Sequence, residues 1–251
     1  MKLLNKVAMI TGAGSGIGQA AALKLNSEGA KIALIGRTPS KLEKVRLEIE
    51  RTGGTAICYP GNVTNKTEID EIVSSISSLG TIEILVNNAG FNSNHRRLLT
   101  TTQVEINDVL EANLKGAIYC VQAVTPQMKK AGCGTIINIG SIAGITPSSL
   151  GGMIYGASKA ALLNFTSFLN EDLKNTGIRA SILCPGEVDT PFLNKRPVPP
   201  SVEARTMMIA AEDVAEIISL IATLPIRTNI PIMTIVPTFK RESALEKESN
   251  I

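Results

Sequence analysis

The chain has 251 residues, of which 44% are hydrophobic and 19% charged, and its formal net charge is +3. A chain of this kind buries a core without help from disulfide bonds, its four cysteines form no Cys-x-x-Cys pair, and a single histidine builds no multi-histidine metal site. Interspersed charges and the absence of an apolar run of about 20 residues argue against nucleic acid and membrane as partners. We therefore expect a soluble, cytoplasmic protein without a metal, and we place the histidine, His95, on a surface loop.

Short apolar segments alternate with longer amphipathic segments along the chain, which is typical of strand–helix units and a parallel sheet. Because such a sheet is covered on both faces, the helices must form two layers. The prediction is an α/β, Rossmann-type doubly wound fold: a seven-stranded parallel sheet with helices on both faces, in one domain spanning residues 1–251. We predict strands at 7–10, 31–35, 56–59, 82–86, 135–139, 179–183 and 231–236, and helices near 17–28, 40–51, 66–78, 103–129, 154–175 and 212–223.

Two segments interrupt this alternation. Residues 187–210 are rich in proline and predict a long irregular loop, and loops of that length usually serve as lids or binding loops. We name residues 187–210 the substrate loop. Residues 239–251 are predicted to form a charged tail that frays.

A glycine-rich segment follows the first predicted strand and leads directly into the first predicted helix. Glycines at such a turn let the backbone approach a diphosphate, and the helix N-terminus supplies free N–H groups. The spacing Gly-x-x-x-Gly-x-Gly fits the generic dinucleotide motif only loosely, so a tight turn without a ligand is the alternative. The residues expected to contact the cofactor here are Gly12, Ser15, Gly16, Ile17 and Gly18.

The end of the second strand indicates which dinucleotide is bound. A carboxylate at this position binds the ribose 2′-hydroxyl of NAD, whereas an arginine accommodates the 2′-phosphate of NADP. The sequence has Arg37 here and no carboxylate, with Thr38 and Lys41 close by. NADP (NADPH) is therefore favoured, and NAD stays possible if Arg37 is only a solvated side chain.

Tyr155 and Lys159 stand four residues apart at the start of a predicted helix, so both lie on one face. A nearby ammonium stabilises a phenolate, which predicts a lowered pKa for Tyr155. Ser141 follows the fifth strand, at the edge of the sheet where α/β folds hold ligands. Its hydroxyl is placed to hold a substrate oxygen.

With these residues the chain resembles the short-chain dehydrogenase/reductase family, short single-domain type with a Tyr-x-x-x-Lys active site. The resemblance implies that Tyr155 exchanges a proton with the substrate oxygen and that Ser141 steadies this oxygen. It also implies that Lys159 holds the nicotinamide ribose, and that Asn113 anchors a water chain to Lys159. The motifs run in order along almost the whole chain: Thr11-Gly12-x-x-x-Gly16-x-Gly18, Asn87-Asn88-Ala89-Gly90, Asn113, Ser141, Tyr155-x-x-x-Lys159 and Pro185-Gly186.

The resemblance implies further contacts to the cofactor. Asn62 stands where the family more often has Asp, and its amide oxygen can still accept a hydrogen bond from adenine. The alternatives are structural: Asn88 ties strands together, Asn113 is a buried amide, and Thr190 caps a short helix. The implied contacts are Asn88, Ala89 and Gly90 at the adenosine ribose, Asn62 and Val63 at adenine, and Pro185, Gly186, Val188 and Thr190 at the nicotinamide carboxamide.

The predicted function is an NAD(P)(H)-dependent oxidoreductase that interconverts a ketone or aldehyde and an alcohol by hydride transfer, working as an NADPH-dependent carbonyl reductase. Alternatives are a 3-oxoacyl-[acyl-carrier-protein] reductase-like activity, which the missing C-terminal Asp-Gly-Gly turn makes less favoured, and a non-catalytic NADP-binding regulatory protein. The hypothesis of a serine hydrolase is rejected because the order of Ser and His along the chain does not match that of α/β hydrolases. The expected partners are a small carbonyl or alcohol substrate and further copies of the chain, in a dimer or homotetramer.

The substrate pocket is expected between the substrate loop and the start of the helix that carries Tyr155. Its mostly apolar character indicates a neutral or hydrophobic ketone. Arg96, Arg97 and Lys195 are within reach of a substrate carboxylate, with solvated surface charges as the favoured interpretation. The expected lining residues are Ala143, Gly144, Ile145, Met153 and Ile154.

Overall fold

The computed structural model describes residues 1–239, 241 and 243. In these residues seven strands form one sheet in the order β3-β2-β1-β4-β5-β6-β9, and every neighbouring pair is parallel. Each predicted strand is present. The strands are β1 (Val7–Thr11), β2 (Lys31–Gly36), β3 (Ala56–Pro60), β4 (Ile82–Asn87), β5 (Gly134–Ile139), β6 (Ile178–Pro185) and β9 (Ile232–Ile235).

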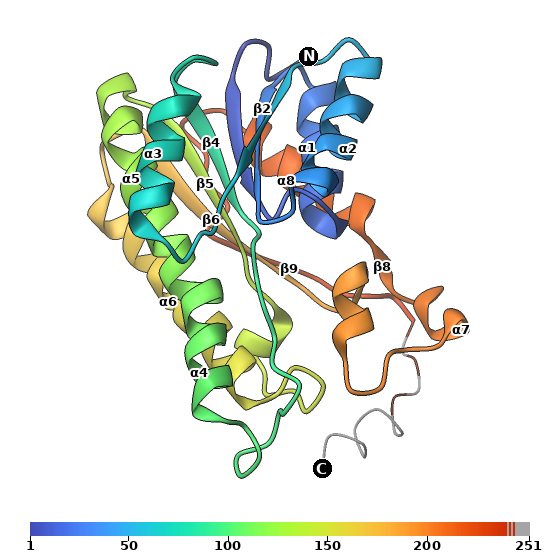
Figure 1. Ribbon diagram of the computed structural model, residues 1–251. Helices are drawn as coiled ribbons and strands as arrows, with labels where there is room; N and C mark the ends of the chain where they lie inside the picture. The colour runs from blue at the N-terminus through green and yellow to red at the C-terminus, as the bar shows by residue number, and fades with distance from the viewer. Residues whose placement is uncertain (240, 242, 244–251) are drawn as a thin grey trace.

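Helices cover both faces of this sheet, as Figure 1 shows. Alternate residues of β1 enter two separate cores: Ala8 and Ile10 pack on one side, Val7 and Met9 on the other. The predicted Rossmann-type doubly wound fold is therefore confirmed. One layer holds α1 (Gly16–Ser27), α2 (Pro39–Arg51) and α8 (Ala211–Thr223), and the other holds α3 (Lys66–Ile76), α5 (Gly116–Ala131) and α6 (Met153–Asp172).

The helix predicted over residues 103–129 is present, but it contains a turn of π-helix that the sequence did not reveal. The structure has α4 (Gln103–Leu110), then a π-helical turn η1 (Glu111–Lys115), and only then α5. Asn113 lies in the π turn with its side chain buried and hydrogen-bonded to the backbone of Phe91. Such single turns of π-helix occur frequently at functional sites.

The substrate loop is more ordered than the predicted irregular segment. Its two ends pair as short parallel strands, β7 (Val188–Asp189) and β8 (Ile209–Ala210). Between them lie a 3₁₀-helix, η3 (Pro191–Lys195), and a short helix, α7 (Val202–Arg205). Most of the predicted charged tail, 239–251, lies outside the described residues; Phe239, Arg241 and Ser243 lie within them.

The strand order creates the crevice in which a ligand fits. The chain proceeds from β1 outward through β2 and β3, then returns to the other side of β1 as β4. The connections after β1 and β4 therefore diverge at the carboxyl ends of these two strands, where open α/β sheets bind their ligands. The glycine turn after β1 and the segment after β4 both lie at this edge.

Candidate functional site

The glycine turn after β1 has the geometry that its sequence predicts. Gly12 and Gly16 have φ values of +65° and +54°, a region that favours glycine. A Cβ on Gly18 would lie 2.3 Å from the carbonyl oxygen of Gly12, so the start of α1 packs against the turn without side chains between them. Ser15 occupies the N-cap position of α1 without a side-chain cap hydrogen bond to any described residue. The glycine turn has no large side chains, and the N–H groups at the start of α1 have no side-chain cap. This combination fits a diphosphate.

Asn88 holds this turn in place. Its Nδ2 donates hydrogen bonds to the carbonyl oxygens of Thr11, at 3.0 Å, and Gly12, at 3.2 Å. The hydroxyl of Thr11 accepts in return from the backbone N–H groups of Asn88 and Ala89, both at 3.0 Å. The side chain of Asn88 thus ties the end of β1 to the segment that follows β4, which is the structural alternative named from the sequence.

Ser141, Tyr155 and Lys159 are brought together at the carboxyl end of β5. Ser141 caps a 3₁₀-helix, η2 (Ile142–Gly144), with its hydroxyl accepting from the N–H of Ala143 at 3.2 Å, and its side chain also hydrogen-bonds with Tyr155. Lys159 is 5% exposed, and its Nζ lies 5.7 Å from the centroid of the Tyr155 ring. The same Nζ donates a hydrogen bond to the carbonyl oxygen of Ile139 at 2.8 Å.

The predicted lowering of the Tyr155 pKa was wrong for the structure described here. Burial raises the pKa of the Tyr155 phenol, while the hydrogen bond with Ser141 and the guanidinium groups of Arg196 and Arg96 oppose this rise. Burial also lowers the pKa of the Lys159 amine to about 8. Both groups therefore favour their neutral forms more than they do in water, since a buried charge loses its hydration.

Asn113 and Gly90 border the space next to Lys159. The amide of Asn113 donates to the carbonyl oxygen of Phe91, at 2.9 Å, and to the hydroxyl of Ser158, at 3.0 Å, and accepts from the N–H of Phe91 at 2.7 Å. A Cβ on Gly90 would lie 3.3 Å from Oδ1 of Asn113 and 3.8 Å from Nζ of Lys159. Glycine at position 90 therefore keeps the gap between the amide and the amine open.

Arg37 is exposed at the end of β2, directly before α2. Thr38 follows it at the N-cap position of α2. The stem of Lys41 lies over the glycine turn, because a Cβ on Gly14 would be 2.9 Å from the Cβ of Lys41. These positive side chains thus lie on the same side of the sheet edge as the turn that fits a diphosphate.

The predicted adenine contacts, Asn62 and Val63, follow β3. Oδ1 of Asn62 accepts a hydrogen bond from the N–H of Thr64 at 3.3 Å. Val63 is buried, and its side chain would lie 2.7 Å from a Cβ on Gly116 at the start of α5. The side chain of Val63 therefore packs against α5.

The predicted carboxamide contacts lie where β6 leads into the substrate loop. Gly186 donates its N–H to the carbonyl oxygen of Ile235 in β9 at 2.8 Å. Thr190 reaches the glycine turn, since a Cβ on Gly16 would be 3.1 Å from the Cβ of Thr190. Thr190 stands at the N-cap position of η3 but makes no side-chain cap hydrogen bond within the described residues. Sequence motifs separated by more than 170 residues thus meet at one turn.

The aromatic ring of Phe192, which sequence reasoning missed, lies beside the phenol. Its centroid is 6.2 Å from that of Tyr155, with the ring planes 45° apart. Among the predicted lining residues, Ile145 and Met153 are exposed, whereas Ile154 is buried. Proximity of Phe192 could not be inferred from the sequence because it depends on how the substrate loop folds back over α6.

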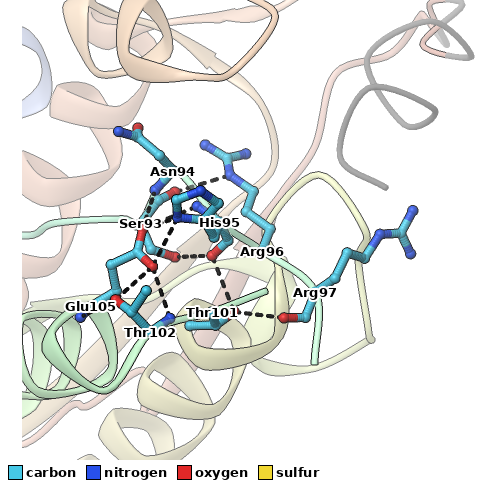
Figure 2. Close-up of polar contacts among 8 residues, drawn as sticks. All are labelled: Ser93, Asn94, His95, Arg96, Arg97, Thr101, Thr102 and Glu105. Carbon is cyan, nitrogen blue, oxygen red and sulfur yellow. Dashed lines mark hydrogen bonds and ion pairs between the residues drawn. The ribbon is translucent and has the colours of Figure 1, made fainter. Parts of the chain in front are cut away.

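Arg96 is buried, so the favoured interpretation as a solvated surface charge was wrong for this residue. It is 4% exposed, its Nε donates to the carbonyl oxygen of Ser93 at 3.2 Å, and its NH1 donates to the carbonyl oxygen of Leu150. Figure 2 shows the guanidinium groups of Arg96 and Arg97 pointing away from the neighbouring Glu105. Because Arg96 and Arg196 both act on the pKa of Tyr155, two guanidinium groups lie within electrostatic range of the phenol.

His95 lies on an exposed loop, as predicted. Its side chain is 59% exposed, and Nδ1 lies 3.1 Å from the carboxylate of Glu105 (Figure 2). Burial raises the pKa of Glu105, but hydrogen bonds from Thr102 and His95 outweigh it and bring the value to about 2. Thr102 and Glu105 form a capping box at the start of α4, so this cluster fixes the helix and is separate from the chemistry of Tyr155.

The described residues contain neither a metal-binding cluster nor a membrane-spanning helix. No group of three or more His, Cys, Asp or Glu side chains there is arranged to hold a metal ion. No described helix combines the length and apolar character that crossing a membrane requires.

Comparisons with known proteins agree with this geometry. The family model for short chain dehydrogenases matches residues 6–198. A protein described as an uncharacterized oxidoreductase of Staphylococcus aureus is 36% identical over 239 residues, which cover 94% of this chain and 98% of the relative. A metagenomic short-chain oxidoreductase solved in complex with NADP has a TM-score of 0.83 at 31% identity, covering 96% of this chain and 100% of that one. The closed form of a serine dehydrogenase complexed with NADP+ has a TM-score of 0.86 at 30% identity, covering 95% and 97%.

Proposed function

Because the chain belongs to the short-chain dehydrogenase/reductase family and is an NAD(P)-dependent oxidoreductase, we propose that it reduces a ketone or aldehyde to an alcohol with NADPH. The observation that carries this proposal is the meeting of Ser141, Tyr155 and Lys159 at the same sheet edge as the glycine turn. We also propose that residues 1–251 form a single domain that binds the cofactor and carries the catalytic residues.

Tyr155 is the proton donor in reduction. Its raised pKa keeps the phenol protonated at neutral pH, which is the form that gives a proton to the carbonyl oxygen. Ser141 hydrogen-bonds with the phenol and so lies where its hydroxyl also holds the same substrate oxygen. In oxidation the proton moves in the opposite direction, from the alcohol to Tyr155.

NADPH supplies the hydride when it is bound. The backbone of the turn from Gly12 to Gly18 holds its diphosphate, and Arg37 pairs with the 2′-phosphate through its planar guanidinium. Ser15 and Ile17 belong to this turn. The adenosine half is lined by Asn62, Val63, Asn88, Ala89 and Gly90. The carboxamide is oriented by Pro185, Gly186, Val188 and Thr190.

Lys159 holds the nicotinamide ribose and returns a proton to Tyr155 after each reduction. A water chain anchored by Asn113 carries this proton, and Gly90 places no side chain between Asn113 and Lys159. Burial lowers the pKa of the Lys159 amine to about 8. A pKa near neutral pH suits an amine that gains and loses a proton during turnover.

A second substrate class is favoured by one specific observation. The guanidinium groups of Arg96 and Arg196 lie within electrostatic range of the phenol, and a carboxylate is the group that arginine binds in two-pronged fashion. A serine dehydrogenase is also among the similar structures. A hydroxy acid or hydroxy amino acid is therefore the second candidate, beside a neutral ketone.

Assembly and cellular location are part of the same proposal. We propose that the protein is cytoplasmic and forms a dimer or homotetramer in which the long helices α5 and α6 contact those of another copy.

The experiment is a panel of ketones, aldehydes, oxo acids, a 3-oxoacyl-[acyl-carrier-protein] substrate and the matching alcohols, run with NADPH and NADH in parallel. The proposal expects oxidation of NADPH with at least one carbonyl compound. Turnover confined to acyl-carrier-protein substrates would establish the alternative reductase, and NADPH binding without any turnover would establish a regulatory role.

A further inference from the structure

Glu187 lies at the start of the substrate loop and binds two arginines from different segments. Its Oε1 accepts a hydrogen bond from NH1 of Arg196 at 2.8 Å. Arg241 binds both carboxylate oxygens, with Nε 2.7 Å from Oε2 and NH2 2.6 Å from Oε1. The Arg241 side chain is 4% exposed. A two-pronged contact of this kind is the strongest geometry that a guanidinium and a carboxylate make.

The two arginines connect Glu187 to parts of the chain that are far apart in sequence. Arg196 directly follows η3, the helix that carries Phe192 against Tyr155. Arg241 comes after β9, at the end of the described chain. The backbone carbonyl of Glu187 also accepts from the N–H of Ile209, which closes the base of the loop at 3.0 Å. We name the contact of Glu187 with Arg196 and Arg241 the loop clasp.

Apolar packing alone does not join the substrate loop to the C-terminal segment. A cavity of about 390 Å³ lies between them, lined by Met207, Met208 and Ile209 on one side and by Val236 and Phe239 on the other. Because this space is open to solvent, the clasp is a direct polar connection between the two segments beside a groove.

The charges in the clasp depend on one another. Burial raises the pKa of Glu187, but the hydrogen bonds from Arg241 and Arg196 outweigh it, so the pKa lies below its usual range. Removing one partner from a buried ion pair leaves the other charge uncompensated, which costs far more than losing an exposed pair.

We propose that Glu187 and Arg241 are positioning residues that hold the substrate loop closed against Tyr155 and the glycine turn. They act through Phe192, which lies beside the phenol, and through Thr190, which lies against Gly16. Arg241 thereby makes the C-terminal segment part of the apparatus that binds the substrate and the nicotinamide end of the cofactor. The kinetic part of this inference rests on the proposed function, whereas its conformational part does not.

The test compares Glu187→Gln, Arg241→Met and Arg241→Lys with two matched controls. Glu171→Gln alters an exposed carboxylate paired with Lys174. Arg46→Met removes a half-buried arginine of α2 that pairs with Glu43 and Glu50. The first readout is trypsin cleavage of the ligand-free protein after Lys195 and Arg205, followed by mass spectrometry. We expect cleavage at these two sites to be at least tenfold faster in Glu187→Gln and Arg241→Met and unchanged in both controls.

The second readout separates positioning from stability. We expect KM for the carbonyl substrate and Kd for NADPH to rise about five- to tenfold in the clasp variants, with kcat within threefold and Arg241→Lys in between. Unchanged cleavage, KM and Kd in both Glu187→Gln and Arg241→Met would overturn the inference, as would a lower melting temperature without any change in these three values. If the wild type turns over nothing in the panel, the proposed function fails, and trypsin cleavage still decides whether the clasp holds the loop.

Discussion

The amine of Lys159 donates a hydrogen bond to the backbone carbonyl oxygen of Ile139 and lies 5.7 Å from the centroid of the Tyr155 ring. The carbonyl ends β5, so the sheet itself holds the amine beneath the phenol. This contact satisfies one N–H of a side chain that is almost fully buried. The active site therefore includes a cation whose burial opposes folding.

Replacing Lys159 with Met should stabilise the ligand-free protein while it abolishes turnover. Burial lowers the pKa of Lys159 from 10.5 to about 8, so the folded protein binds fewer protons than the unfolded chain between these values. Stability then rises with pH across this window, and below pH 8 the full cost of the buried ammonium, about 3 kcal/mol, is present. We expect Lys159→Met to raise the free energy of unfolding at pH 7 by about 1–3 kcal/mol, the lower end reflecting the lost hydrogen bond.

Urea unfolding of both proteins at several pH values measures this difference. It should shrink as the pH rises from about 8 to above 10.5, where Lys159 is neutral in the unfolded chain as well as in the folded protein. The exposed Lys174→Met is the control and should change stability by less than about 0.5 kcal/mol. A Lys159→Met variant less stable than the wild type at pH 7 would contradict the account.

The pH dependence of the reaction should reflect a phenol that is weakly acidic. Alcohol oxidation needs the phenolate of Tyr155, and burial raises the pKa of this group. Because kcat/KM reports the ionisation of the free enzyme, we expect kcat/KM for oxidation to keep rising from about pH 7 to at least about pH 9. Ser141→Ala removes a hydrogen bond that lowers the pKa of Tyr155, so the rise should move to still higher pH. A plateau reached below neutral pH would show that the phenol is acidic after all.

Two glycines with nearly equal positive φ values allow backbone strain to be distinguished from steric fit. Gly12 and Gly132 have φ values of +65° and +66°. A Cβ on Gly12 would lie 2.8 Å from Nδ2 of Asn88, whereas a Cβ on Gly132 meets nothing described within 4 Å. Gly132→Ala should cost about 1–2 kcal/mol of stability through its left-handed backbone alone, with unchanged NADPH affinity. Gly12→Ala should cost more and should lose NADPH binding; equal effects of the two variants on the measured Kd would exclude a cofactor role for the turn.

Arg37 should determine the choice between the two dinucleotides. A hydrogen bond from a charged donor contributes about 1.5–3 kcal/mol. Arg37→Met is therefore expected to weaken NADPH binding about tenfold or more and to leave NADH binding within about twofold, because NADH has no 2′-phosphate. Fluorescence titration of both cofactors measures this. Equal losses for the two cofactors would mean that Arg37 recognises another part of the nucleotide.

Much of the fold and part of the site follow from local patterns in the sequence. The central strands are short apolar segments buried on both faces, so they were predictable from their own residues. The positive φ values of Gly12 and Gly16 and the shared face of Tyr155 and Lys159 also depend on neighbours within a few residues. Features set by local spacing were therefore accessible without a structure.

What the sequence did not reveal depends on contacts between distant segments. The apolar pattern of residues 103–129 continues through Asn113, and only the pairing of Asn113 with Phe91 indicates the π turn. The sequence predicts Arg96 to be a surface charge. In the structure it is buried and donates hydrogen bonds to the carbonyl oxygens of Ser93 and Leu150. The pKa of Tyr155 depends on burial and on guanidinium groups from two other segments, so the spacing to Lys159 alone gave the wrong direction.

The central claim is that the phenol of Tyr155 transfers the proton in an NADPH-dependent reduction. The most direct test compares Tyr155→Phe with the wild type, measuring kcat for the best carbonyl compound of the panel and the Kd for NADPH. We predict a fall in kcat of about 100- to 10,000-fold, with the Kd for NADPH unchanged within about twofold. A Tyr155→Phe variant that reduces the carbonyl compound at the wild-type rate would contradict the account.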